Sequence, residues 1–298
     1  MKYIVCFSGG HSSAIIAIEA VRRYGKENVI LLNHGICPRV EDADIERFRQ
    51  EVASYLGLPI TPCNMDGYEQ NDHFDVCVSI GAFQVVPGQQ LCTAKFKTEP
   101  FMAWLRDNYP VEKGKIREDV VILYGFDPEE PHRMERRKAI LAKAGYKADF
   151  PLAWERRTIK ATEEIGIDRP TRYETFCHAN CNGCLKGGKQ HWYVTYCLFP
   201  ETFEKAKWAE EQIGHSILKP SQGFLKVLEP EFESLKKAGL PATERIKSQT
   251  FWAMARKLLK QPADMRHRKK VYQRGRERAK IILNDQKLDR SRRTENEA

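Results

Sequence analysis

Four cysteines, Cys177, Cys181, Cys184 and Cys197, fall within a single short window of the sequence. Cys181 and Cys184 form a Cys-x-x-Cys pair with Gly183 inside it, and a glycine lets such a turn direct both sulfurs at one ion. No second Cys-x-x-Cys pair and no His-x-x-x-His pair is present to complete an ordinary zinc site. The window therefore predicts a metal centre, with zinc and an iron–sulfur cluster as the alternatives.

A second segment has the residues of an anion-binding loop. Ser8-Gly9-Gly10 directly follows a short apolar run, and a helical pattern comes after it. Two glycines let successive backbone N–H groups turn toward one anion, and the N-terminus of the helix adds a positive end. The glycine spacing is not that of a Walker loop or a dinucleotide fingerprint, and a plain Gly-Gly turn with a serine cap is the alternative. The residues that we expect to meet the anion are Ser8, Gly9, Gly10, His11, Ser12 and Ser13.

Two further segments combine sulfur, acidic and basic groups. Cys92 is followed closely by Lys95 and Lys97, which pairs a soft ligand with anion-binding charge. The lysines would favour the thiolate form of Cys92. Farther on, an apolar run is followed by glycine, acidic residues and a cationic helix start, where Arg133 and Arg137 lie one turn apart. An exposed ion pair from Glu130 to Arg133, which would be worth little, is the alternative there.

The elements that must position these residues alternate between strand-like and helix-like patterns. Apolar runs predict strands at 3–7, 29–33, 60–63 and 120–124, and helical spacing predicts helices at 14–23, 44–56 and 131–144. Such alternation is typical of the doubly wound α/β class, a mostly parallel sheet with crossover helices. Ligands of these sheets bind beyond the carboxyl ends of the strands. Residues 67–90 have no clear pattern, and we expect them to form a loop that crosses the site.

The second half of the chain is organised differently. We expect an α/β nucleotide-binding domain at 1–170, a Cys-rich metal segment packed on it at 171–215, and a basic helical C-terminal extension at 216–298. The sequence predicts helices at 201–213, 243–259 and 272–283, with the last ten residues disordered. The excess positive charge lies at the end: residues 241–298 hold 17 Lys and Arg against 7 Asp and Glu, and the other 240 residues hold 32 against 33. A basic extension suits a nucleic-acid backbone, and a solvated helical tail is the alternative.

Composition argues against an integral membrane protein. The mean hydropathy is −0.56, and no run approaches the roughly 18 apolar residues of a membrane helix. The N-terminus lacks the longer apolar region and cleavage site of a secretory signal. We therefore expect no membrane partner and a cytoplasmic location.

Taken together, the four segments resemble the phosphoadenosine phosphosulfate (PAPS) reductase-like family of the PP-loop adenine nucleotide alpha hydrolase superfamily. Residues 8–13 resemble the PP-loop, Ser-Gly-Gly-x-Asp-Ser, with Ser12 in place of Asp. Residues 91–101 look like the Cys-Cys-x-x-Arg-Lys-x-x-Pro stretch of sulfonucleotide reductases, with one cysteine instead of two. Residues 125–133 resemble the turn Gly-x-x-x-x-Glu-x-x-Arg, and residues 180–192 look like the Asn-Cys-x-Gly-Cys-x-Lys-Gly-Gly-Lys-x-x-Trp segment of phage and bacterial members. The likeness leaves the basic tail uncovered.

The resemblance implies a doubly wound, Rossmann-like fold that binds ATP or a related adenine nucleotide (APS or PAPS), together with Mg²⁺. It implies that Cys92 joins Cys181 and Cys184 as ligands of a [4Fe–4S] cluster, with Cys177 or Cys197 as the fourth; zinc is the alternative. The catalytic candidates are Cys92, Lys95 and Cys197. Beyond the loop at 8–13, the residues that we expect to contact the nucleotide are Lys97, Glu130, Arg133, Arg137, Lys186 and Lys189.

The function implied is that of an enzyme for ATP-dependent sulfur transfer to a nucleic acid or nucleotide acceptor. Its partners would be tRNA or DNA, bound by the basic tail, and a protein that donates sulfur or electrons. The first alternative is thiol-dependent reduction of adenylylsulfate or phosphoadenylylsulfate, although no cysteine follows Cys197. The second is a non-catalytic nucleic-acid-binding module with a structural zinc.

Overall fold

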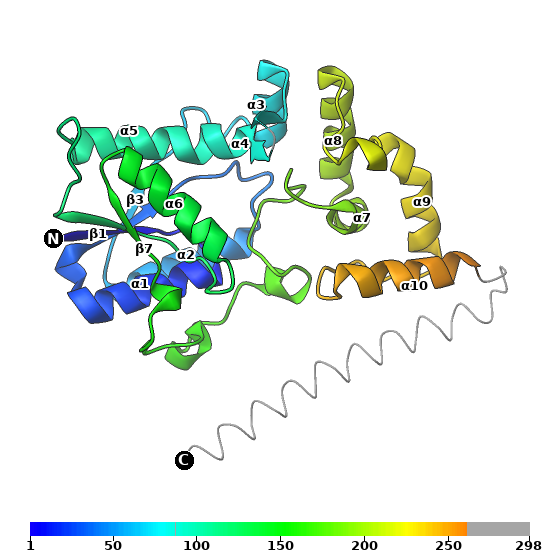
Figure 1. Ribbon diagram of the computed structural model, residues 1–298. Coiled ribbons are helices and arrows are strands. Elements are labelled where there is room, and N and C mark those ends of the chain that lie inside the picture. The colour runs from blue at the N-terminus through cyan, green and yellow to red at the C-terminus, as the bar shows by residue number, and fades with distance from the viewer. Residues whose placement is uncertain (87, 261–298) are drawn as a thin grey trace, which may run out of the picture.

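A parallel sheet forms the first half of the molecule (Figure 1). The computed structural model describes residues 1–86 and 88–260. Five strands lie in the order β3-β2-β1-β6-β7 and all pair in parallel. Their bounds are Lys2–Cys6 for β1, Val29–Asn33 for β2, Ile60–Pro62 for β3, Val120–Leu123 for β6 and Lys147–Asp149 for β7. The predicted α/β class is confirmed, with the four expected strands close to their predicted bounds.

Helices cover both faces of this sheet. Successive side chains of a strand point to opposite faces, so Val5 and Ile4 of the central strand belong to different cores. Val5 packs with helices α1 (His11–Tyr24) and α2 (Ala43–Leu56), whereas Ile4 packs with α5 (Glu99–Asn108) and α6 (Pro131–Lys143). Short 3₁₀ turns link the elements: η1 (Lys26–Asn28), η3 (Pro151–Ala153), η4 (Thr162–Ile165), η5 (Thr171–Glu174) and η6 (Pro220–Gln222).

The other half of the molecule is a group of helices around an aromatic core (Figure 1). It contains α3 (His73–Ile80), α4 (Leu91–Thr93), α7 (Lys189–Leu198), α8 (Pro200–Ile213), α9 (Leu225–Lys237) and α10 (Ser248–Lys260). Trp192, Phe203, Phe232 and Phe251 are fully buried in this core. The core also runs across the expected boundary at 215, because Ala209 and Leu218 both belong to it.

The expected loop at 67–90 is wrong. This segment contains α3, which packs against α8, and a hairpin of β4 (Gln84–Val86) and β5 (Gln89–Gln90). The local signals were present, since Asp72 caps the helix, Asp75 completes a capping box, and Gly81 ends the helix in the left-handed conformation. A helix of eight residues is too short for its apolar spacing to stand out.

At the C-terminal end of the described chain, α10 buries Phe251 and Ala255. The predicted helix at 272–283 and the predicted disorder of the last ten residues lie outside the described residues. Of the helices that are described, none combines the length and the apolar character that a membrane crossing requires.

Candidate functional site

The candidate site lies at the point where the strand order of the sheet reverses. From β1 the chain proceeds to β2 on one side, whereas β6 pairs with β1 on the other side. The loop after β6 touches the first turn of α1, which follows β1: a Cβ atom on Gly125 would lie 3.0 Å from the backbone carbon and oxygen of Ser12. Doubly wound sheets bind ligands at this reversal, and the predicted anion loop therefore occupies the expected position.

The glycines shape the anion loop. Gly9 has a φ of +77°, and a Cβ atom there would lie 2.7 Å from Cγ2 of Ile45, so the turn requires glycine. Gly10 is the N-cap of α1, and its carbonyl accepts a hydrogen bond from the hydroxyl of Ser13 at 2.7 Å. Ser8 and Ser12 are exposed, and the first turn of α1 contains no acidic residue. The positive end of this helix can therefore face an anion.

His11 turns away from this anion loop. Its Nε2 accepts a hydrogen bond from the backbone N–H of Thr162 in η4 at 3.3 Å. Burial, with the nearby charge of Arg169, lowers the pKa of His11 to about 4, so the ring is a neutral acceptor at physiological pH. The backbone N–H of His11 is also occupied, because it donates to the hydroxyl of Tyr173 at 3.1 Å.

The Cys-rich segment lies directly on the anion loop. A Cβ atom on Gly10 would lie 3.3 Å from Cβ of Ala179 and 3.4 Å from the hydroxyl oxygen of Tyr173. Tyr173 belongs to η5, and Ala179 lies two residues before Cys181. The structure therefore brings the start of the Cys-x-x-Cys turn next to the loop after β1.

The turn from Cys181 to Cys184 is held on several sides. The N–H of Asn182 donates to the carbonyl of Val40 at 2.8 Å, and its side-chain oxygen accepts from Arg172 at 2.5 Å. The carbonyl of Gly183 lies 2.9 Å from Nε2 of His73. Gly183 has a φ of +64°, and a Cβ atom there would lie 2.7 Å from a methyl carbon of Thr202. Glycine inside the pair is thus a requirement of this packing.

The three thiols that the resemblance groups together are electrostatic neighbours. Burial raises the pKa of Cys92 to about 11, with a further rise from Cys184 and an opposing effect of Lys97 and Lys186. A hydrogen bond with Cys181 lowers the pKa of Cys184, and the same bond, with burial and the charge of Cys92, raises the pKa of Cys181. Lys97 thus favours the thiolate form of Cys92, as expected, but burial has the larger effect and the pKa is raised overall.

An irregular helix carries Cys92 and its lysines. After α4 the backbone forms a π-helical turn, η2 (Ala94–Thr98), which runs into α5. Pro100 has no N–H to continue the regular hydrogen bonds, and π-helical turns inside helices are frequent at functional sites. The ammonium of Lys95 pairs with Glu99 at 2.9 Å, whereas Lys97 is exposed.

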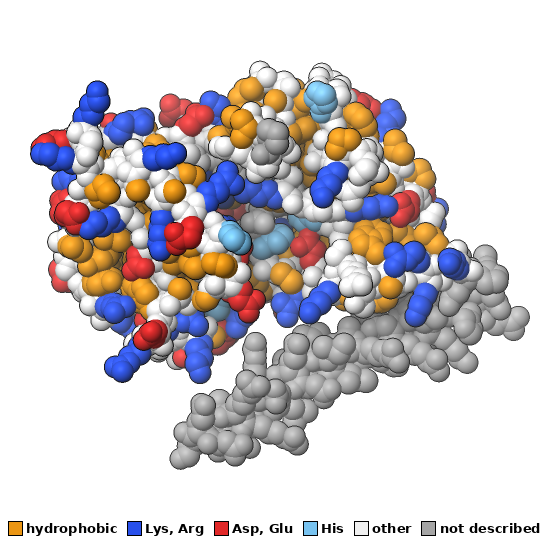
Figure 2. Space-filling view, viewed as in Figure 1, with side chains coloured by type: hydrophobic (Ala, Val, Ile, Leu, Met, Phe, Trp, Pro, Cys, Tyr) orange, Lys and Arg blue, Asp and Glu red, His pale blue; other side chains and the backbone are white. Residues whose placement is uncertain are grey.

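Cationic side chains lie near the thiols. Lys186 extends into solvent, yet partial desolvation, with the charges of Lys97 and Arg133, lowers its pKa against the opposing effect of Cys184 and Cys92. Arg133 pairs with Glu130 at 2.9 Å, as the alternative interpretation holds, and its guanidinium also lies over the ring of Phe126. Figure 2 shows a hollow between the two halves of the molecule, with Lys and Arg side chains along one edge and His and acidic side chains within it.

The remaining candidates lie in other surroundings. Arg137 lies over the ring of Tyr124 at 5.0 Å, and Lys189 pairs with Glu231 in the helical half. Cys177 is exposed, and its thiol lies 3.4 Å from the carbonyl of Glu244. Burial raises the pKa of Cys197, whose thiol lies beside the hydroxyl of Tyr193 and near Lys236. None of these contacts joins Cys177 or Cys197 to the other three thiols within the described chain.

The spacing of the thiols bears on which metal group they suit. Among the described residues, one set of three His, Cys, Asp or Glu ligand atoms lies within 4.8 Å of one another, and it contains no cysteine. A tetrahedral zinc site with Zn–S bonds of about 2.3 Å places its sulfurs about 3.8 Å apart. Among the described residues the three thiols do not form such a set, although the hydrogen bond between Cys181 and Cys184 brings two of them together, so the choice between zinc and a cluster stays a prediction.

Sequence reasoning missed several residues at this site. His178, His191 and Glu244 make up the set of three ligand atoms. Arg172 and Tyr173 tie the Cys-rich segment to the α/β half, through an ion pair with Asp42 and a hydrogen bond from His11. Both histidines lie within the cysteine window at 177–197, so their proximity along the chain was visible. The position of Glu244, which lies 53 residues beyond His191, was not.

The chain matches no protein-family model, no curated protein and no solved structure at a significant level. The resemblance to the PAPS reductase-like family therefore stays a prediction that is based on its four segments.

Proposed function

We propose that the chain is a nucleotide-dependent enzyme of sulfur chemistry, most simply an ATP-dependent sulfurtransferase that acts on a nucleic acid or nucleotide. The contact of Gly10 with Ala179 and Tyr173 is the observation that carries this proposal. An anion loop and a pair of thiols are separate features in sequence, and this contact supports their use in one reaction.

The two features would serve successive steps. ATP would place its phosphates on residues 8–13, the acceptor oxygen would attack the α-phosphorus, and pyrophosphate would leave. A sulfur nucleophile would then form a bond to the activated carbon, and AMP would leave with the acceptor oxygen. Pyrophosphate and AMP are both anions, and the cations of Lys97, Lys186 and Arg133 would stabilise them.

The thiols supply a donor set for the second step. Cys92, Cys181 and Cys184 would hold a [4Fe–4S] cluster, which when bound supplies an iron site able to carry sulfide. Fully buried Arg172 would help to neutralise a negatively charged group there, since its guanidinium and the two paired thiols influence one another electrostatically.

The structure offers less support to the other readings. A sulfonucleotide reductase needs a nucleophilic cysteine, and Cys197, the last cysteine, lies half-buried in the helical half with a raised pKa. A non-catalytic module would give no reason for the anion loop and the thiols to meet.

Nucleotide turnover tests the proposal. Purified protein incubated anaerobically with ATP, a sulfide source and mixed tRNA should release AMP and pyrophosphate. Ser8→Glu puts a negative charge into the exposed part of the anion loop and should lower ATP affinity at least tenfold. Ser54→Glu is the matched control, because Ser54 is also exposed but lies in the last turn of α2. This turn leads into β3, so it lies at the amino ends of the strands, whereas the anion loop lies at their carboxyl ends. ATP affinity that is equal in both variants would contradict the proposal.

A further inference from the structure

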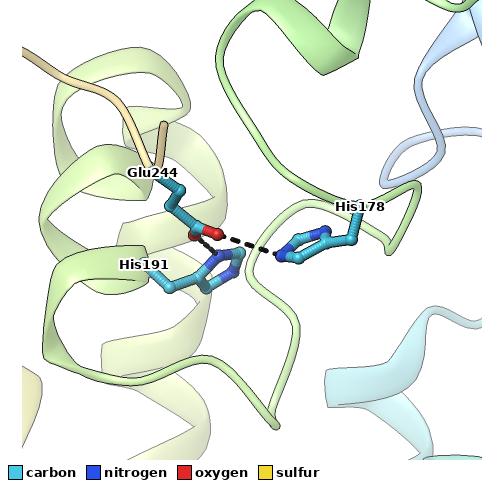
Figure 3. Close-up of side chains that lie close together, drawn as sticks. All are labelled: His178, His191 and Glu244. Carbon is cyan, nitrogen blue, oxygen red and sulfur yellow. Dashed lines mark hydrogen bonds and ion pairs between the residues drawn. The ribbon is translucent and has the colours of Figure 1, made fainter. Parts of the chain in front are cut away.

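Three side chains from separate segments meet behind the Cys-x-x-Cys turn (Figure 3). Glu244 lies in the link between α9 and α10, and its two carboxylate oxygens face two imidazoles. Nδ1 of His191 lies 2.5 Å from one oxygen, and Nε2 of His178 lies 3.1 Å from the other. A carboxylate and two imidazoles are a possible metal-binding set. They can bind a metal ion only if the ring nitrogens that face Glu244 carry no proton, so the positions of the ring protons decide between a metal site and a hydrogen-bonded group.

The second nitrogen of each ring settles the protonation. Nε2 of His191 accepts a hydrogen bond from the backbone N–H of Cys184 at 3.0 Å. Nδ1 of His178 accepts one from the backbone N–H of Asn180 at 3.3 Å. An imidazole nitrogen that accepts from an N–H carries no proton, so the proton of each neutral ring lies on the nitrogen that faces Glu244. Those nitrogens then have no lone pair for a metal, and both donate to the carboxylate.

The group therefore links one carboxylate to two backbone amides of the cysteine turn. Asn180 directly precedes Cys181, and the second amide is that of Cys184 itself. The backbone of Glu244 holds the same segment, since its N–H donates to the carbonyl of Thr175 at 2.8 Å. Although burial opposes it, the hydrogen bonds from His178 and His191 lower the pKa of Glu244 to about 2, so the carboxylate is charged.

We propose that Glu244 is a positioning residue for the paired thiols: through His178 and His191 it fixes the amides of Asn180 and Cys184, and thereby the spacing at which Cys181 and Cys184 present their sulfurs to a metal group. The inference rests on the proposed function for the purpose of that spacing. Residues that orient metal ligands through hydrogen bonds commonly contribute about ten- to a hundredfold to metal affinity.

Cobalt binding tests the role without nucleotide or sulfur transfer. Metal-free, reduced full-length protein is titrated with Co²⁺, and binding by the thiols is followed through the cobalt–thiolate charge-transfer absorption. Glu244→Gln should weaken this binding about tenfold, because an amide accepts from one imidazole but not from both. Glu244→Asp, which keeps the charge, should recover part of the affinity. Glu233→Gln is the control, since Glu233 forms an exposed ion pair with Lys237 on α9.

Hydrogen exchange adds a local readout. The amide of Cys184 should exchange about tenfold faster in Glu244→Gln, while amides of β1 and β6 keep their protection. Faster exchange throughout the chain would indicate a merely structural role and overturn the inference. If Glu244→Gln does not fold, His178→Ala takes its place, because this ring is 31% exposed, and the amide of Asn180 is then followed.

Two other outcomes would overturn the inference. One is unchanged cobalt affinity and unchanged exchange in a folded Glu244→Gln variant. The other is Co²⁺ binding that persists, without the thiolate absorption, in Cys181→Ser/Cys184→Ser and disappears when Glu244→Gln is added, because this would make the three side chains a metal site. Absence of sulfurtransferase activity alone would count against the proposed function and leave the cobalt result standing.

Discussion

The backbone N–H of His11 donates to the hydroxyl of Tyr173 at 3.1 Å, across 162 residues of sequence. This bond joins the first turn of α1 to the segment that leads into the cysteine turn. It also fills one of the donors that an anion at the helix N-terminus would use.

Tyr173→Phe should therefore have two opposite effects. Without an anion, the N–H of His11 loses its partner, and the free energy of unfolding should fall by about 1 kcal/mol. With the donor freed, the affinity for ATP should rise several-fold. Urea unfolding and a nucleotide-binding titration check the two effects. Lower ATP affinity in the variant would show that the hydroxyl helps to bind the anion instead of competing with it.

The cysteines should differ in their contribution to a metal group. Protein purified anaerobically should be brown and contain iron and acid-labile sulfide. Cys92→Ser, Cys181→Ser and Cys184→Ser should each lose most of the iron, whereas Cys197→Ser should keep it, because its thiol lies among Tyr193 and Lys236. Iron and sulfide analysis of each variant makes the comparison. Colourless protein with stoichiometric zinc would contradict the cluster assignment.

Two half-buried histidines should make stability depend on pH. Burial lowers the pKa of both His11 and His34 to about 4, from an ordinary value of 6.5. The unfolded chain therefore binds more protons between these values, and the stability that the neutral rings provide is present above about pH 6.5 and lost as pH falls toward 4. Urea unfolding across this range should show the decline.

A double variant isolates the contribution of these rings. His11→Gln keeps an acceptor near the position of Nε2, and His34→Asn keeps a donor near Nδ1, which lies 2.7 Å from the carbonyl of Cys63. This variant should have a flatter profile between pH 6.5 and 4. A profile as steep as that of the wild type would assign the decline to other groups.

The basic residues at 261–298 should contribute to the binding of nucleic acid. Of the 17 basic and 7 acidic residues at 241–298, 5 and 1 lie at 241–260, which leaves 12 and 6 beyond Lys260. Deletion of 261–298 should weaken binding to tRNA or DNA and flatten its dependence on salt. Deletion from Pro241 should unfold the helical half, because it removes Phe251 from the core and Glu244 from the cysteine turn. Equal salt dependence with and without 261–298 would place the contact surface elsewhere.

Sequence patterns were informative where the cause of structure is local. The strand at Val29–Asn33 matches its prediction because a continuous apolar run between polar residues has few alternatives. The short helix at His73–Ile80 was missed because its capping residues are a weaker signal than apolar spacing. The environment of Cys92 was also beyond the sequence, since the burial that raises its pKa depends on packing against the helical half.

The same limit applies to the candidate site. The glycine loop and the Cys-x-x-Cys turn were evident from residue types, because each is a short turn with a glycine at a demanding position. That Tyr173 and Ala179 lie on Gly10 is a tertiary contact, and no spacing in the sequence encodes it. For Lys95 the error was local. It was assigned to the site because it lies near Cys92 in the sequence, but its ammonium pairs with Glu99 one helical turn later.

Cysteine labelling in the presence of nucleotide tests the central claim most directly. Reduced, metal-free protein is treated with iodoacetamide with and without ATP, and the rate at each cysteine is measured by mass spectrometry. ATP should slow the labelling of Cys92 and Cys181 in the wild type but not in Ser8→Glu, while Cys197 reacts at the same rate throughout. Slower labelling of Cys197 alone, or ATP binding with no effect on Cys92 and Cys181, would show that the nucleotide and the thiols do not share a site.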